Sequence, residues 1–70
     1  MNELFEKLIV ELAEKKHTVT VSTDNYNHKY ISMGTFTITD MKDCINIYAP
    51  NFYINVKDWD SMMLVVNSIR

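Results

Sequence analysis

A chain of 70 residues is long enough for one domain and too short for two, and it buries only about 60% of the surface that it exposes when unfolded. Hydrophobic residues make up 47% of the sequence, with one glycine and one proline, which is typical of a folded domain and not of a disordered chain. A net charge of −2 argues against non-specific binding to nucleic acid, and an enzyme of this size would need a metal, a cofactor or an oligomer interface to build its site.

The single cysteine, Cys44, cannot form an internal disulfide, which fits a reducing compartment. The beginning of the sequence, Met-Asn-Glu-Leu-Phe-Glu, lacks the basic residues and apolar run of a secretory signal. No stretch approaches the roughly 18 apolar residues of a membrane span. We therefore expect a cytoplasmic protein without a membrane partner, located in the bacterial host cell if a phage encodes it.

Residues 2–16 carry the pattern of an amphipathic helix. The apolar residues recur at helical spacing, at Leu4, Phe5, Leu8, Ile9, Leu12 and Ala13. Asn2 is suited to cap the first turn. Two pairs of opposite charge stand four residues apart and support the helix, Glu3 with Lys7 and Glu11 with Lys15.

Residues 17–22 alternate Val with Thr and Ser, which predicts a half-buried strand, and the polar residues 23–27 predict a turn. Alternation resumes over residues 29–39 but changes parity at Gly34. Either a β-bulge at Gly34 keeps one strand continuous, or the segment breaks there into two short strands. We adopt the continuous strand for the fold.

The rest of the chain reads as a hairpin, a strand and a helix. Asp40-Met41-Lys42-Asp43 predicts a turn, Ile45 and Ile47 mark the next strand, and Ala49-Pro50-Asn51 ends it. Residues 52–56 alternate as the last strand. Residues 58–70 return to helical spacing, with Asp58 as the predicted N-cap.

These elements predict one α+β domain over residues 1–70: a helix, a four-stranded antiparallel sheet and a second helix, with both helices on one sheet face as a two-layer sandwich. The predicted core comprises Leu4, Phe5, Leu8, Ile9, Leu12, Val19, Val21, Ile31, Met33, Phe36, Ile38, Ile45, Ile47, Phe52, Ile54, Val56, Trp59, Met62, Met63 and Val66.

The opposite face of the predicted sheet carries Thr, Ser, Tyr and Asn and no charged residue. Exposed strands usually include Lys or Glu, whereas interfaces are depleted in both and enriched in Tyr. The candidate protein-binding residues on this face are Tyr30, Thr35, Thr37, Asn46, Tyr48, Tyr53 and Asn55. The alternative is that Thr and Tyr are simply good strand formers on a solvated surface.

Carboxylates supply a second set of candidate contacts. Glu3, Glu6, Glu11 and Glu14 lie on the outer side of the first helix, and Asp40 and Asp43 share one hairpin. These groups would steer association with a basic partner, or they form an ordinary solvated surface.

No catalytic, metal or cofactor motif is present. His17, His28 and Cys44 are isolated from one another, whereas a structural zinc site needs about four ligands in paired spacings. One glycine cannot build a Gly-rich phosphate loop. Aromatic and basic residues interleave from Tyr26 to Tyr30, as in single-strand nucleic-acid binders, but the seven Lys and Arg residues are scattered. We expect no enzyme activity, no cofactor and no metal.

The order of elements resembles that of several small phage-encoded inhibitor proteins, among them some anti-CRISPR proteins. The shared plan is an amphipathic helix from Asn2-Glu3-Leu4-Phe5 to Lys16, a Thr/Val strand from Thr18 to Ser22, a small antiparallel sheet and a closing helix. The resemblance spans most of the chain, is one of architecture, and transfers no functional residue. It implies a non-enzymatic inhibitor or modulator of a larger host protein, for example a defence nuclease.

Two other functions remain open from the sequence. A homo-oligomeric structural or accessory protein would pair the uncharged sheet face, or an edge strand, across a two-fold axis as a homodimer. A small single-strand nucleic-acid binder is the other alternative, which the acidic net charge disfavours.

Overall fold

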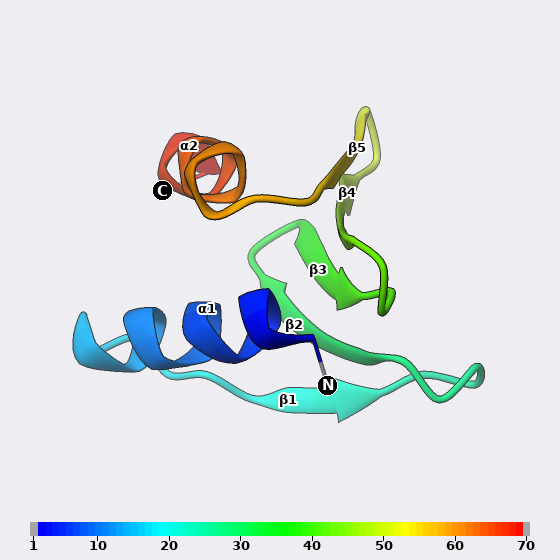
Figure 1. Cartoon of the computed structure of the whole chain (residues 1–70), viewed down its shortest axis with the longest axis horizontal. Coiled ribbons are helices and arrows are strands. Elements are labelled where there is room, and N and C mark those ends of the chain that lie inside the picture. Colours follow the sequence, from blue (N-terminus) through cyan, green and yellow to red (C-terminus); the bar gives the residue numbers. More distant parts are fainter. Residues whose placement is uncertain (1, 70) are drawn as a thin grey trace.

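The computed structural model describes residues 2–69, with only the backbone described for Ile69. The elements follow one another as α1 (Glu3–Glu14), β1 (Val21–Thr23), β2 (Lys29–Met33), β3 (Phe36–Asp40), β4 (Ile45–Ala49), β5 (Phe52–Val56) and α2 (Trp59–Ile69). The strands form one antiparallel sheet in chain order, so each pairs with its neighbour in the sequence (Figure 1). The end of the last helix predicted at Arg70 lies outside the described residues.

The sheet has five strands, so the prediction of four is wrong. Gly34 and Thr35 form a two-residue turn between β2 and β3, and Gly34 has a φ of 62°, which glycine adopts without strain. Met33 lies opposite Phe36 across this turn, so both side chains share one face. The change of parity at Gly34 therefore comes from a hairpin, not from a bulge.

The first predicted strand is also shorter than expected. β1 begins at Val21, and residues 17–20 make no ladder with β2. The reason lies at the end of α1, where Lys16 adopts a φ of 65° and its N–H donates to the Ala13 carbonyl at 3.0 Å. The His17 N–H donates to the Leu12 carbonyl at 3.0 Å, which completes a Schellman motif. A cavity of about 390 Å³ lies between residues 17–19 and β2.

Both predicted N-caps are confirmed. The Asn2 side chain accepts a hydrogen bond from the Leu4 N–H at 2.8 Å. The Asp58 carboxylate accepts one from the Ser61 N–H and one from the Ser61 hydroxyl, both at 2.9 Å. These two bonds hold the pKa of Asp58 below its ordinary value.

One hydrophobic cluster joins both helices to alternate strand residues. Its buried members are Phe5, Leu8, Leu12, Ile31, Ile38, Ile45, Ile47, Val56, Met62 and Val66, all of which the sequence predicts. Val21 and Phe52, also predicted in the core, are exposed because they lie on the two outermost strands. Val65 packs against the cluster without having been predicted.

Asp40 ties the start of α1 to the loop between β3 and β4. The residue is only 6% exposed, and its carboxylate accepts hydrogen bonds from the Asn2 N–H at 2.9 Å and the Lys42 N–H at 3.0 Å. The Asn2 side-chain amide donates to the Lys42 carbonyl at 2.6 Å. Two segments about forty residues apart in the sequence are thus joined through the Asp40 carboxylate and the Asn2 side chain.

Candidate functional site

Strand residues that point away from the hydrophobic cluster form a surface that we call the open face. The strand register arranges them in two rows across the sheet. The first row is Ser22, Tyr30, Thr39, Asn46 and Asn55, and the second is Ser32, Thr37, Tyr48 and Tyr53. None of these residues is charged. The two-residue turn at Gly34 preserves this face, because residues paired across it remain on the same side of the sheet.

Tyr48 and Tyr53 are the most prominent side chains of the open face. They are direct cross-strand partners on β4 and β5, and they are 44% and 73% exposed. A tyrosine side chain has few rotatable bonds, a large apolar ring and a hydroxyl at its tip. The pair therefore offers contact area that loses little conformational entropy when it is buried against a partner.

In the row next to this pair, the polar side chains in the middle of the open face are hydrogen-bonded to one another or to the backbone. Asn46 is buried, and its side-chain amide donates to the Asn55 side chain at 3.0 Å and lies 3.5 Å from the Ile54 carbonyl. Thr39 beside it is also buried. No buried side-chain nitrogen or oxygen among the described residues lacks a hydrogen-bond partner. The open face thus holds no orphaned polar group that a small ligand would satisfy.

The predicted binding residues differ in how accessible they are. Tyr48, Tyr53 and Asn55 are exposed, and Tyr30 and Thr37 are half-buried. Asn46 is buried, as described above. Thr35 was predicted on this face, but it occupies the turn after Gly34, because the chain reverses direction there.

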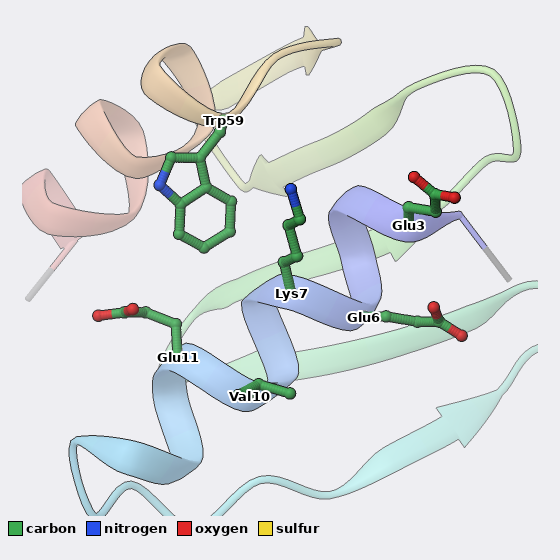
Figure 2. A pocket seen from close by; sticks show the side chains of 6 residues that line it. All are labelled: Glu3, Glu6, Lys7, Val10, Glu11 and Trp59. Atoms are coloured by element: carbon green, nitrogen blue, oxygen red, sulfur yellow. The ribbon is translucent and has the colours of Figure 1, made fainter.

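Three of the predicted acidic residues meet at a groove between α1 and α2. The groove has a volume of about 510 Å³ and is lined by Glu3, Glu6, Lys7, Val10, Glu11 and Trp59. Figure 2 shows the Trp59 indole directed from α2 toward α1, with the Lys7 side chain extending toward α2 beside it. Glu11 is paired with Lys15 at 3.1 Å. Lys7 and Lys15 thus offset part of the negative charge, so the groove presents mixed charge around one aromatic ring.

The other predicted acidic residues do not join this groove. Glu14 and Asp43 are exposed on α1 and on the β3–β4 loop. Asp40 was predicted as a contact for a basic partner, but it is buried and already accepts two backbone hydrogen bonds. Its role in the structure is to hold the N-terminus of α1.

The turn between β1 and β2 contains the interleaved aromatic and basic residues. Asp24 accepts hydrogen bonds from the His28 N–H at 2.8 Å and the Tyr26 N–H at 2.9 Å, and these bonds lower its pKa. The His28 imidazole lies 3.7 Å from the Asp24 carboxylate, and the Lys29 ammonium donates to the Thr23 hydroxyl at 2.8 Å. The basic groups are engaged within the turn itself.

The described residues hold no cluster of three or more His, Cys, Asp or Glu side chains suited to a metal ion. Neither α1 nor α2 has the length and hydropathy to cross a membrane.

Sequence reasoning did not predict that Val10 and Trp59 line one groove together. Val10 stands outside the apolar stripe of α1, which was the one available signal, but only the packing of α2 brings Trp59 beside it.

Comparison with known proteins gives no relative from which a role can be transferred. No family model, no curated protein and no solved structure matches the chain.

Proposed function

We propose that this chain is a non-enzymatic protein-binding module that uses the open face of its sheet to bind and modulate a larger protein. In this proposal the two helices cover one side of the sheet as a two-layer sandwich, and the other side remains free for the partner. The observation that carries the proposal is the exposed Tyr48–Tyr53 pair on a face without charged residues.

The composition of the open face supports this role. Binding a protein partner removes water from both surfaces. A Lys or Glu buried in this way loses its hydration and is stabilised only if the partner supplies an opposite charge or hydrogen bonds. The open face has neither residue, and its central amide, Asn46, is already hydrogen-bonded to Asn55. A partner would therefore bury tyrosine rings and threonine methyl groups without leaving a charge unpaired.

The type of partner follows from size and from the resemblance in architecture. A chain of 70 residues seldom encloses a substrate cavity, but it is large enough to block a site on another protein. We propose a phage or mobile-element product in the bacterial cytoplasm, acting as a stoichiometric inhibitor of a host protein such as a defence nuclease.

The test is an affinity pull-down of the tagged protein from bacterial lysate, followed by titration of each captured protein with purified variants. Tyr48→Lys and Tyr53→Lys place a charge on the open face, and Tyr26→Lys is the matched control because Tyr26 is 81% exposed and lies in the β1–β2 turn. A central tyrosine contributes about 2 kcal/mol or more to such interfaces, so we expect at least about a thirtyfold loss of affinity for the first two variants.

The control variant Tyr26→Lys should bind with the affinity of the unmodified chain. Equal affinities for Tyr48→Lys, Tyr53→Lys and Tyr26→Lys would show that the partner binds elsewhere. Capture of nucleic acid that is lost in the Tyr26→Lys variant would favour the single-strand binder instead.

A further inference from the structure

The outer edge of β5 presents backbone groups that no described segment covers. β5 is the last strand of the sheet, and in Figure 1 it lies at one end with no element beyond its outer edge. Ala49 and Phe52 flank a two-residue turn and form the first hydrogen-bonded pair of the β4–β5 hairpin. Because bonded and non-bonded pairs alternate, Ile54 and Val56 also bond to β4. Tyr53 and Asn55 therefore direct their N–H and C=O groups outward.

β5 lacks the features by which proteins usually protect such an edge. Natural edge strands are short, or carry a charge, a proline or a bulge. β5 runs over Phe52-Tyr53-Ile54-Asn55-Val56 with no charge and no proline, and its register with β4 is unbroken. The opposite edge differs, because β1 has only three residues. The two edges of the sheet thus differ in length and protection, and β5 is the edge that another strand can pair with.

We propose that β5 pairs antiparallel with β5 of a second copy of this chain, across a two-fold axis at Ile54. In this register Tyr53 lies opposite Asn55 of the second copy, and each such pair exchanges two backbone hydrogen bonds. Ile54 meets Ile54 of the second copy, and Phe52 meets Val56. The strand is therefore complementary to itself in both its backbone groups and its side chains.

Charge and exposure support a second copy as the occupant. The first charged residue beyond the strand, Lys57, would lie opposite Asn51 of the second copy, so no like charges face each other. Phe52 is exposed and Ile54 is half-buried on the side of the hydrophobic cluster, and both would gain an apolar neighbour. The strands of both copies would form one continuous sheet.

This inference does not depend on the proposed function, because it concerns the edge of the sheet and not its open face. It adds that the two open faces become one surface carrying two Tyr48–Tyr53 pairs related by the two-fold axis. A partner would then meet two identical sites on one rigid body.

The register is tested by disulfide trapping of single-cysteine variants in a Cys44→Ser background. Opposed residues of a non-bonded antiparallel pair have Cα atoms about 4.5 Å apart, which is within disulfide range, so Ile54→Cys should crosslink to its copy. Tyr53→Cys and Asn55→Cys would be offset from their own copies by two residues, with Cα atoms roughly 9 Å apart. We expect Ile54→Cys to form covalent dimer at least about tenfold faster than either control, because only it satisfies the geometry.

A second measurement keeps the inference testable if Ile54→Cys folds poorly. Light scattering of the unmodified chain should show its mass rising from 8.2 kDa toward twice that value as the concentration increases. Methylation of the Asn55 backbone amide, introduced by semisynthesis with ligation at Cys44, should prevent this rise while retaining every side chain. A monomer at millimolar concentration, or crosslinking of Tyr53→Cys as fast as Ile54→Cys, would overturn the proposal.

The two proposals fail separately. Tyr48→Lys should weaken partner binding by the factor given above and leave the dimer intact, because Tyr48 lies on β4 and does not face the β5 edge. Methylation at Asn55 should abolish the dimer and leave Tyr48 available.

Discussion

Replacing Asp40 with alanine tests how much one buried carboxylate contributes to the fold. The Asp40→Ala variant loses two hydrogen bonds, from the Asn2 N–H at 2.9 Å and the Lys42 N–H at 3.0 Å, and leaves both donors without their acceptor. A hydrogen bond to a charged group contributes about 1.5–3 kcal/mol, and partial access of water to the freed donors reduces this. We therefore expect a loss of about 2–4 kcal/mol in the free energy of unfolding.

This loss is large for a chain of this length, whose total stability is expected to be roughly 4–10 kcal/mol. In guanidinium chloride, with an m-value of about 2 kcal/mol/M, the unfolding midpoint should fall by about 1–2 M. Circular dichroism measures the transition, and Asp43→Ala is the matched control because Asp43 is exposed in the loop that follows Asp40 and carries the same charge. Midpoints that fall equally in the two variants would show that net charge, and not the hydrogen bonds to Asn2 and Lys42, explains the effect.

The remaining predictions concern pH and backbone conformation. Backbone hydrogen bonds lower the pKa of Asp24 and of Asp58. Each carboxylate therefore stabilises the fold above pH 3.8, its ordinary pKa, and this contribution is lost as the pH falls through the lowered pKa. Titration midpoints at or above 3.8, measured by NMR of the carboxyl carbons, would contradict this. Lys16 has a φ of 65°, so Lys16→Gly should raise the free energy of unfolding by about 0.5–1 kcal/mol. Gly34→Ala, at a φ of 62°, should instead lower the free energy of unfolding by about 1–2 kcal/mol, although no atom lies within 4 Å of the added Cβ. Thermal unfolding temperatures that shift in the same direction for the Lys16 and Gly34 variants would refute the argument.

Local patterns were sufficient to predict the helices and most of the core. The spacing of Phe5, Leu8 and Leu12 on α1 defines one buried stripe, and these side chains are fully or almost fully buried. Asn2 and Asp58 were recognisable as caps because a capping side chain bonds to the turn that directly follows it. Such features depend on residues within one helical turn, which the sequence shows directly.

The number of strands could not be decided in the same way. A bulge at Gly34 and a two-residue turn at Gly34 and Thr35 both move the apolar residues from odd to even positions. The two arrangements differ in whether Met33 pairs with Phe36 across the sheet. The sequence pattern is the same in both cases and does not predict this pairing. Tyr48 and Tyr53 follow Gly34 in the sequence, and either arrangement leaves them as exposed cross-strand neighbours on β4 and β5.

Burial of Asp40 was unpredictable for a related reason. An aspartate at a hairpin is usually explained by local turn geometry, and the Lys42 N–H bond fits that explanation. The second bond comes from the Asn2 N–H, which is 38 residues away in the sequence. It therefore depends on where the start of α1 lies in the folded protein. The Trp59–Val10 groove has the same origin, since the expectation that both helices lie on one sheet face does not show which of their residues lie side by side.

The chain-order arrangement of the sheet also has a consequence for how the protein folds. Each ladder closes over a short loop, at residues 24–28, 34–35, 41–44 and 50–51, so the sheet can assemble hairpin by hairpin with little loop-closure entropy. The bonds from Asn2 to Asp40 and Lys42 differ from these ladders, because they join the first helix to a loop some forty residues later. During synthesis α1 leaves the ribosome before that loop does, so α1 acquires this anchor only when the third strand and the loop after it have also emerged.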